Sequence, residues 1–374
     1  MTRKHLETLW YTRCGVPTAL GLAARLGWLE QTFGGDGTKI ASLRDSDDQD
    51  VRRSHFDHRL AYSVRQGGSS PAIWARAQGR DTRLIGLIWT DESQQILTLP
   101  GRKIQSVKDL KGRKLALPHH QSDDLPRLDI RGAAALRGFL AALATEGLDE
   151  RDVQFVKLAK VEQREPNNRA AHRGFAYGFG EEVLALLNGE VDAIFVKDAR
   201  GKAIESFLGA VEVIDVGNHP DPAVRVNYGV PRTLTVDGAL ARDYPEVVER
   251  LLGLVLEAGQ WAQEHPRDAL ELAAREVAMP VHFAELAYPR LPTQLRTDLR
   301  EDWIGHLEAY KDFLLKWGFL TADFEVHAWI DRAPLAALRE RSVAQRDASS
   351  QGAAPGPTGR GGVLPAGQTN TSLV

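Results

Sequence analysis

Short apolar runs alternate along most of this chain with longer stretches of helical period, and this alternation constrains the fold more than any other feature. Apolar runs of strand length occur at residues 6–11, 83–89, 96–99, 113–117, 153–158, 191–196 and 211–215. Stretches with a helical apolar face begin at Pro17, cover residues 130–146 and recur at 180–188. Strands that alternate with helices indicate an α/β fold.

The C-terminal third has a different pattern. From Tyr244 the period is persistently helical, and Pro245 and Pro266 stand where the first turn of a helix accepts proline. Two further helices are predicted over residues 298–317 and 334–343. The stretch from Asp347 contains six Gly and three Pro in 28 residues without an apolar face, so residues 344–374 are predicted to be a disordered tail.

Composition excludes several classes of protein. The 374 residues are 43% hydrophobic, which is enough for two domains, and a net charge of −3 gives no reason to expect a nucleic-acid partner. One cysteine excludes an internal disulfide and a Cys-rich zinc module. No apolar run reaches membrane-spanning length, and the N-terminus lacks the apolar core of a leader. We therefore expect a cytoplasmic protein without a membrane span.

Familiar cofactor and catalytic motifs are absent as well. The chain has no Walker loop, no G-x-G-x-x-G after a strand, no H-E-x-x-H and no G-x-S-x-G elbow. His119-His120 with Asp123-Asp124 offers metal-ligand types, but adjacent histidines rarely converge on one ion, so contact with substrate is the better interpretation. We expect neither a cofactor nor a metal.

Three motifs carry a resemblance that predicts the fold. Residues 109–118 (DLKGRKLALP), 187–194 (LNGEVDAI) and the helical segment 244–266 are similar to type II periplasmic solute-binding proteins of the sulfonate and pyrimidine type. The resemblance implies two α/β lobes, an interlobe cleft and extra C-terminal helices. Its implied boundaries are residues 1–105 plus 220–343 for lobe I and residues 106–219 for lobe II.

Four residue types in lobe I could together bind and process an anion. Cys14 follows a predicted strand and precedes a helix, where unpaired amides favour a thiolate or a bound anion. His55 exchanges protons near neutrality, and Arg65 presents a planar fork to two oxygens. Gly67 and Gly68 allow the backbone to approach a ligand. Taken singly, each is more often a core, surface or turn residue, so the prediction depends on their combination.

The same residues resemble the aromatic sulfinate desulfinase family of the dibenzothiophene desulfurization pathway. The likeness covers residues 8–20, the His55-Phe56 pair, and Arg65 followed after one residue by Gly67-Gly68. It departs at Gly15, where the family has proline, and is weak in lobe II. The resemblance and the chemistry of the residues give these site predictions: catalytic Cys14 and His55, and substrate-binding Arg65, Gly67, Gly68 and Phe56.

The resemblance implies a cofactor-independent desulfinase that cleaves the C–S bond of an organic, aromatic sulfinate and releases sulfite. Cys14 would either protonate the ring carbon or attack the sulfur, and both routes remain open. The alternative is a solute-binding protein for sulfonate-like anions that delivers its ligand to a transporter permease. Under both interpretations the partner is a small-molecule anion.

Overall fold

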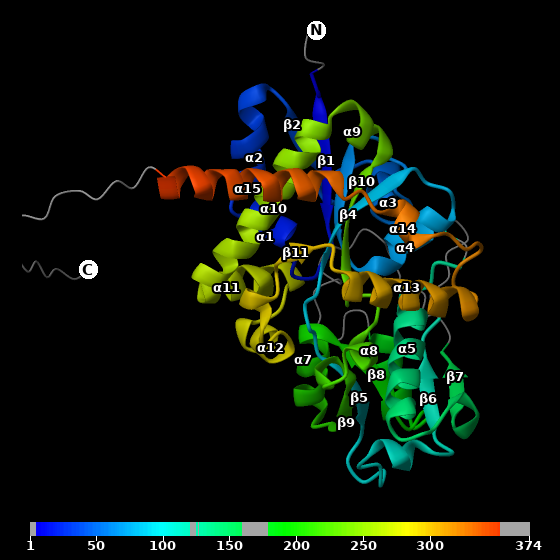
Figure 1. Cartoon of the computed structure of the whole chain (residues 1–374). Coiled ribbons are helices and arrows are strands. Elements are labelled where there is room, and N and C mark those ends of the chain that lie inside the picture. The colour runs from blue at the N-terminus through cyan, green and yellow to red at the C-terminus, as the bar shows by residue number, and fades with distance from the viewer. Residues whose placement is uncertain (1–4, 120–124, 126, 159–178, 352–374) are drawn as a thin grey trace, which may run out of the picture.

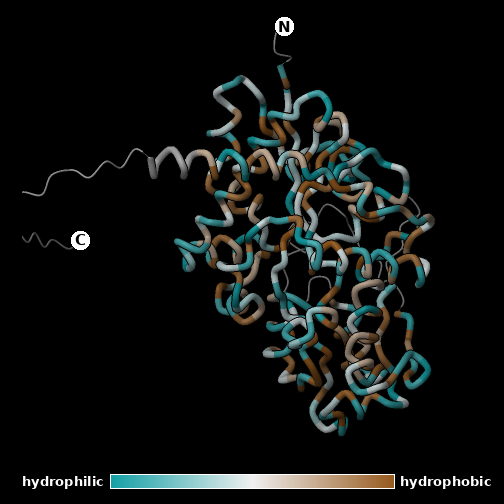
Figure 2. The backbone as a smooth tube through the Cα atoms, in the orientation of Figure 1, coloured by the Kyte–Doolittle hydropathy of each residue, from teal (hydrophilic) through white to brown (hydrophobic). Residues whose placement is uncertain are grey.

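The computed structural model describes residues 5–119, 125, 127–158 and 179–351, without the side chains of residues 345–351. Two α/β lobes lie one above the other, with the N-terminus at the far end of lobe I (Figure 1). Hydrophobic stretches run through the interior of both lobes, and many outer turns are hydrophilic (Figure 2). The predicted α/β fold with two lobes and extra C-terminal helices is confirmed.

Lobe I is built on a six-stranded sheet of mixed direction with the order β11-β4-β10-β3-β1-β2. Its strands are β1 (Thr8–Arg13), β2 (Lys39–Ser42), β3 (Ser63–Gly67), β4 (Thr82–Ile88), β10 (Arg232–Asp237) and β11 (Thr297–Asp298). β1 pairs in parallel with both β2 and β3, whereas β10 is antiparallel to β3 and β4. The carboxyl ends of β1 and β3 therefore lie side by side.

Helices cover this sheet and bury its apolar side chains. They are α1 (Ala19–Arg25), α2 (Trp28–Phe33), α3 (Gln49–Asp57), α4 (Ser69–Ala77), α9 (Gly238–Asp243), α10 (Pro245–Glu264) and α11 (Pro266–Val277). The single helix expected after Pro17 is divided into α1 and α2, because Gly27 takes a positive φ of 74° between them. α10 packs against α1, and α3 packs against α4.

Lobe II contains two small sheets. One has the strand order β8-β5-β9 and the other pairs β6 with β7 in parallel. Its strands are β5 (Gln94–Thr98), β6 (Lys114–Leu117), β7 (Gln154–Lys157), β8 (Ile194–Lys197) and β9 (Val211–Asp215). Its helices are α5 (Ile130–Thr145), α6 (Gly180–Leu187), α7 (Asp198–Leu208) and α8 (Pro222–Arg225). The pairing of β5 with β8 and β9 favours a first crossing between the lobes that ends before Gln94.

The remaining helices follow α11; the first of them, α12, packs against α7 of lobe II as well as against α11. They are α12 (Val281–Ala287), α13 (Glu301–Lys316), α14 (Val326–Trp329) and α15 (Ala333–Gln351). α15 packs on α10 and extends past the helix end expected at Val343 (Figure 1). Residues 352–374, where most of the predicted tail falls, lie outside the described residues. The lobe boundaries themselves remain a prediction.

Candidate functional site

The site predicted from sequence gathers at the carboxyl ends of two neighbouring parallel strands. Cys14 directly follows β1, and Arg65 and Gly67 belong to β3, whose Gln66 is in register with Arg13. His55 comes from the last turn of α3. Ligands of open α/β sheets bind at such strand ends, so the topology alone brings these groups to the position of a binding site.

Cys14 Sγ contacts both of its predicted partners. His55 Nε2 lies 3.5 Å from the sulfur, and Arg65 Nη2 donates to it at 3.3 Å. The backbone N–H of Cys14 donates to Gln66 O at 3.3 Å, which ties the residue to β3. The expected helix start is not at the cysteine, because α1 begins only at Ala19 with Thr18 as its N-cap. The positive charge next to the sulfur therefore comes from a side chain.

His55 is fixed on its second ring nitrogen by a residue that the sequence analysis missed. Thr12 Oγ1 lies 2.8 Å from His55 Nδ1, and Thr12 is buried in β1. Burial lowers the pKa of His55 well below its usual value, and the charges of Arg65 and Arg44 lower it further. The imidazole is thus held neutral at physiological pH. Thr12 and Cys14 are two residues apart in an extended segment, so the period of a strand places them on one face.

Arg65 is buried and incompletely paired. Its Nε donates to His55 O at 3.0 Å and its Nη2 to Cys14, while Nη1 is buried without a hydrogen-bond partner. Burial lowers the pKa of Arg65, with Cys14 and Tyr228 opposing that shift, and a guanidinium remains charged at any physiological pH. Arg65 therefore keeps one strong donor without a partner close to the sulfur of Cys14.

The two glycines are required by close contacts. A Cβ on Gly67 would overlap Cys14 Sγ, and a Cβ on Gly68 would overlap the ring of Tyr228. Gly68 is the N-cap of α4, and Ser69 N donates to Tyr228 O at 2.6 Å. Tyr228 is a second residue missed from sequence, because it lies far from the motif along the chain.

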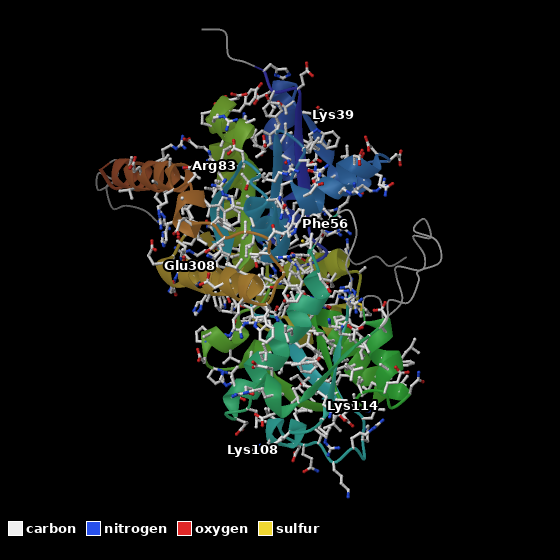
Figure 3. The ribbon with its side chains drawn as sticks, turned by 90° about the vertical axis from the view of Figure 1, so that its right-hand side faces the viewer. Lys39, Phe56, Arg83, Lys108, Lys114 and Glu308 are labelled. Carbon is white, nitrogen blue, oxygen red and sulfur yellow. The ribbon has the colours of Figure 1, made fainter. Side chains whose placement is uncertain are left out.

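A cavity of about 500 Å³ opens beside these groups between the lobes. Lobe I contributes His55, Gly15 and Phe56, and the Phe56 ring meets the His55 ring edge-on at 4.8 Å between centroids. Figure 3 labels Phe56 where the blue segments of lobe I approach the green segments of lobe II. Lobe II contributes an apolar wall: Ile130, Ala134, Ala135, Phe179 and Phe195. The volume suits a ligand of one or two aromatic rings.

Other candidates from the sequence do not join this site. His58 ends α3 in the left-handed region with φ 50°, and both of its ring nitrogens are buried without partners. His119 lies 3.4 Å from Asp129 through Nδ1, while His120, Asp123 and Asp124 lie outside the described residues. Within the described ranges, no group of three or more metal-ligand side chains converges. In the same residues, no helix has the length and apolarity to cross a membrane.

These features define a class: a two-lobed α/β chain of the type II binding-protein fold, with a cysteine, a histidine and an arginine in contact at its interlobe cavity. No protein-family model matches the chain. Among curated proteins it is similar to 2'-hydroxybiphenyl-2-sulfinate desulfinase of Rhodococcus erythropolis, with 25% identity over 348 residues, covering 86% of this chain and 91% of that protein. The desulfinase of Rhodococcus qingshengii matches equally well. The predicted resemblance is confirmed.

Solved structures agree on the fold. A cysteine-to-serine mutant of the desulfurization enzyme DszB in complex with biphenyl-2-sulfinic acid aligns with a TM-score of 0.72 at 24% identity, covering 89% of this chain and 99% of that chain. The periplasmic aliphatic sulphonate binding protein SsuA of Escherichia coli aligns with a TM-score of 0.61 at 17% identity, covering 87% and 92%. At these identities the likeness extends to the fold alone.

Proposed function

We propose that this chain is a cofactor-independent desulfinase that cleaves the C–S bond of an aromatic sulfinate and releases sulfite. One observation carries the proposal: Cys14 Sγ lies within 3.5 Å of both His55 Nε2 and Arg65 Nη2, on a chain similar over most of its length to a sulfinate desulfinase. We also propose that the enzyme works in the cytoplasm.

Arg65 and the glycine pair bind the sulfinate in this proposal. In this proposal the unpartnered Nη1 of Arg65 donates to one sulfinate oxygen. The backbone at Gly67, where a Cβ would overlap the sulfur of Cys14, receives the other. Charge-assisted hydrogen bonds of this kind contribute about 1.5–3 kcal/mol each. Phe56 and the apolar wall of lobe II enclose the aromatic body of the substrate.

Cys14 and His55 carry the chemistry, and two routes use the same groups. In the first, the Cys14 thiol gives its proton to the ring carbon that bears sulfur, and the C–S bond breaks. The released sulfur dioxide takes up water to form sulfite, and the proton set free in this step restores the thiol. In the second, the thiolate attacks the sulfur, the aryl group leaves with the bonding electron pair and takes a proton, and water releases sulfite from Cys14. Either route consumes one water per sulfinate.

His55 serves both routes as the proton-exchange partner of the sulfur. Because its pKa is lowered, the ring is neutral and its Nε2 can exchange a proton with Cys14. Thr12 Oγ1, on Nδ1, is a positioning group that selects which ring nitrogen carries hydrogen.

The test is sulfite release from a panel of aryl and alkyl sulfinates by the unmodified protein and by Cys14→Ser. We expect aryl sulfinates to be turned over, and Cys14→Ser to bind them with near-normal affinity while losing at least about a thousandfold in kcat. Retained sulfite release in Cys14→Ser would exclude the role given to the cysteine. Binding of sulfonates without any sulfite release from sulfinates would favour the solute-binding alternative.

A further inference from the structure

The interlobe cavity carries more positive charge than one sulfinate requires. Its described lining contains six cationic side chains: Arg13, Arg44, Arg52, Arg131, Lys197 and Arg200. Only two acidic side chains, Glu182 and Asp198, stand among the described lining residues. None of these cations is Arg65, which the proposed function already uses at the sulfur of Cys14.

Each cationic side chain that lobe II contributes to the lining has its own carboxylate partner. Arg131 Nη2 lies 2.6 Å from Glu182, and Arg200 Nη1 lies 3.5 Å from Asp198. Lys197 is in contact with the buried Glu92. The excess charge therefore belongs to the wall formed by lobe I.

On that wall, three guanidinium groups share one carboxylate. Arg25 Nε, Arg13 Nη1 and Arg44 Nη1 lie 2.7, 3.2 and 3.6 Å from the carboxylate of Glu276, whose side chain is only 3% exposed. Arg13 Nε is buried without a hydrogen-bond partner. A single carboxylate does not balance three cations, and two of the three, Arg13 and Arg44, line the cavity.

The cluster borders the reacting groups. Arg13 is the residue before Cys14, and the charge of Arg44 reaches His55, where it contributes to lowering the pKa of the imidazole. Between this cluster and the apolar wall of lobe II lies the space for the body of the ligand. The side of the cavity formed by lobe I therefore carries the unbalanced positive charge, whereas lobe II contributes apolar side chains together with paired charges.

We propose that the substrate carries a second anionic group, a carboxylate in the simplest case, which Arg13 and Arg44 bind while the sulfinate lies at Cys14 and Arg65. The inference rests on the proposed function and narrows its substrate class to dianionic aromatic sulfinates. Paired guanidinium donors recognise the two oxygens of such a group through charge-assisted hydrogen bonds.

The test compares benzenesulfinates and biphenyl-2-sulfinates that bear a carboxylate with their methyl esters, which keep the shape and lose the charge. We expect kcat/KM for sulfite release to favour at least one carboxylate over its ester by about tenfold or more. Arg44→Met, which changes a half-exposed side chain, should remove most of that preference. Arg267→Met, on the exposed face of α11, is the matched control and should preserve it.

The outcomes separate the two proposals. Sulfite release without any preference for the carboxylates, or a preference that survives both Arg44→Met and Arg13→Met, overturns this inference and leaves the desulfinase intact. Failure to release sulfite from any sulfinate overturns both. Calorimetric binding of the carboxylate and ester pairs to Cys14→Ser repeats the comparison without turnover, and equal affinities there would also count against the second anion site.

Discussion

At the residue scale, the site is a chain of contacts in which each side chain restrains the next. Thr12 touches His55 Nδ1, His55 Nε2 touches Cys14, and Arg65 reaches both the sulfur and the backbone carbonyl of His55. The sequence predicted three of these four residues, because the His, Arg and Gly-Gly spacing after the cysteine is a recognisable register. Their roles remain predictions.

The residues that the sequence did not reveal lack such a register. Tyr228 lies far from Gly68 in the sequence and contacts it only in the folded protein. In the same way, Arg13, Arg25 and Arg44 come together around Glu276 of α11. Contacts between segments so far apart depend on the packing of whole elements. Thr12 is different, since the strand period already places it on the face of Cys14.

Thr12→Val tests the positioning of His55. The change keeps the shape of the side chain and removes its hydroxyl, so His55 can turn or change tautomer. We expect kcat on an aryl sulfinate to fall about 10- to 100-fold with a smaller change in KM, at a cost of about 1 kcal/mol in the free energy of unfolding. Steady-state kinetics and chemical denaturation measure the two effects.

Thr297→Val is the matched control for this change. Thr297 lies in the edge strand β11, is buried, and its hydroxyl has no hydrogen-bond partner, so its replacement should leave kcat unchanged. Equal kinetics for the two variants would show that Thr12 has no part in orienting the imidazole.

At the scale of elements, strand β3, which carries Arg65, could not be predicted from the sequence pattern. β3 has a single aliphatic side chain, Val64, yet all five of its residues are buried. Its polar side chains are buried in hydrogen bonds: Arg65 with Cys14, Gln66 with Leu20 N and Ser63 with Leu60 O. The usual alternation of apolar and polar residues therefore does not identify it. The apolar strands β1, β4, β5 and β8 were predicted within a few residues, because apolar burial is their main role.

The end of α3 couples stability to pH. His58 closes this helix, and burial, reinforced by the charges of Arg65, His55 and Arg80, lowers its pKa well below the usual value. Below about pH 6.5 the unfolded chain binds protons at His55 and His58 that the folded chain does not. The free energy of unfolding should therefore fall as the pH drops through this range, by up to about 1.4 kcal/mol per pH unit for each histidine.

His58→Asn isolates the contribution of His58, because Asn tolerates the left-handed backbone at the helix end and does not titrate. We expect denaturation at pH 7, 6 and 5 to show a shallower decline for this variant than for the unmodified protein. His282→Asn, at an exposed position of α12, should leave the slope as it is. An unchanged slope in His58→Asn would contradict the assignment.

At the scale of the whole molecule, the lobes meet around a buried ion network at their crossing. Glu92, between β4 and β5, pairs with Arg232 at 2.7 Å and with Lys197. Burial alone would raise the pKa of Glu92, but Lys197 and Arg232 outweigh it and lower the pKa. Lys197 Nζ also lies 3.9 Å from the ring centroid of Tyr228, which packs on Gly68. The ion network at the crossing is thus in contact, through Tyr228, with the glycine pair of the site.

The two-lobed architecture could be predicted because three short segments, residues 109–118, 187–194 and 244–266, resemble those of type II solute-binding proteins. The part of the cavity lining that lobe II contributes could not be predicted. The alanines of α5 that line the cavity cannot be distinguished in the sequence from ordinary core residues. Residues 159–178, which precede α6, lie outside the described residues. Under the proposed function, the substrate therefore meets a wall for which the sequence motifs carry little information.

The most direct test of the central claim is the position of the substrate's sulfur in a crystal of Cys14→Ser soaked with biphenyl-2-sulfinate. In Cys14→Ser the protein keeps only the sulfur atoms of Met1 and Met279, and neither is among the described residues that line the cavity, so an anomalous sulfur peak there would belong to the ligand. We predict that this peak lies next to Arg65, with the sulfinate oxygens in hydrogen-bonding contact with its guanidinium. The rings should lie between Phe56 and the apolar wall of lobe II. A sulfinate bound away from Arg65, with the guanidinium still directed only at residue 14 and His55, would contradict it.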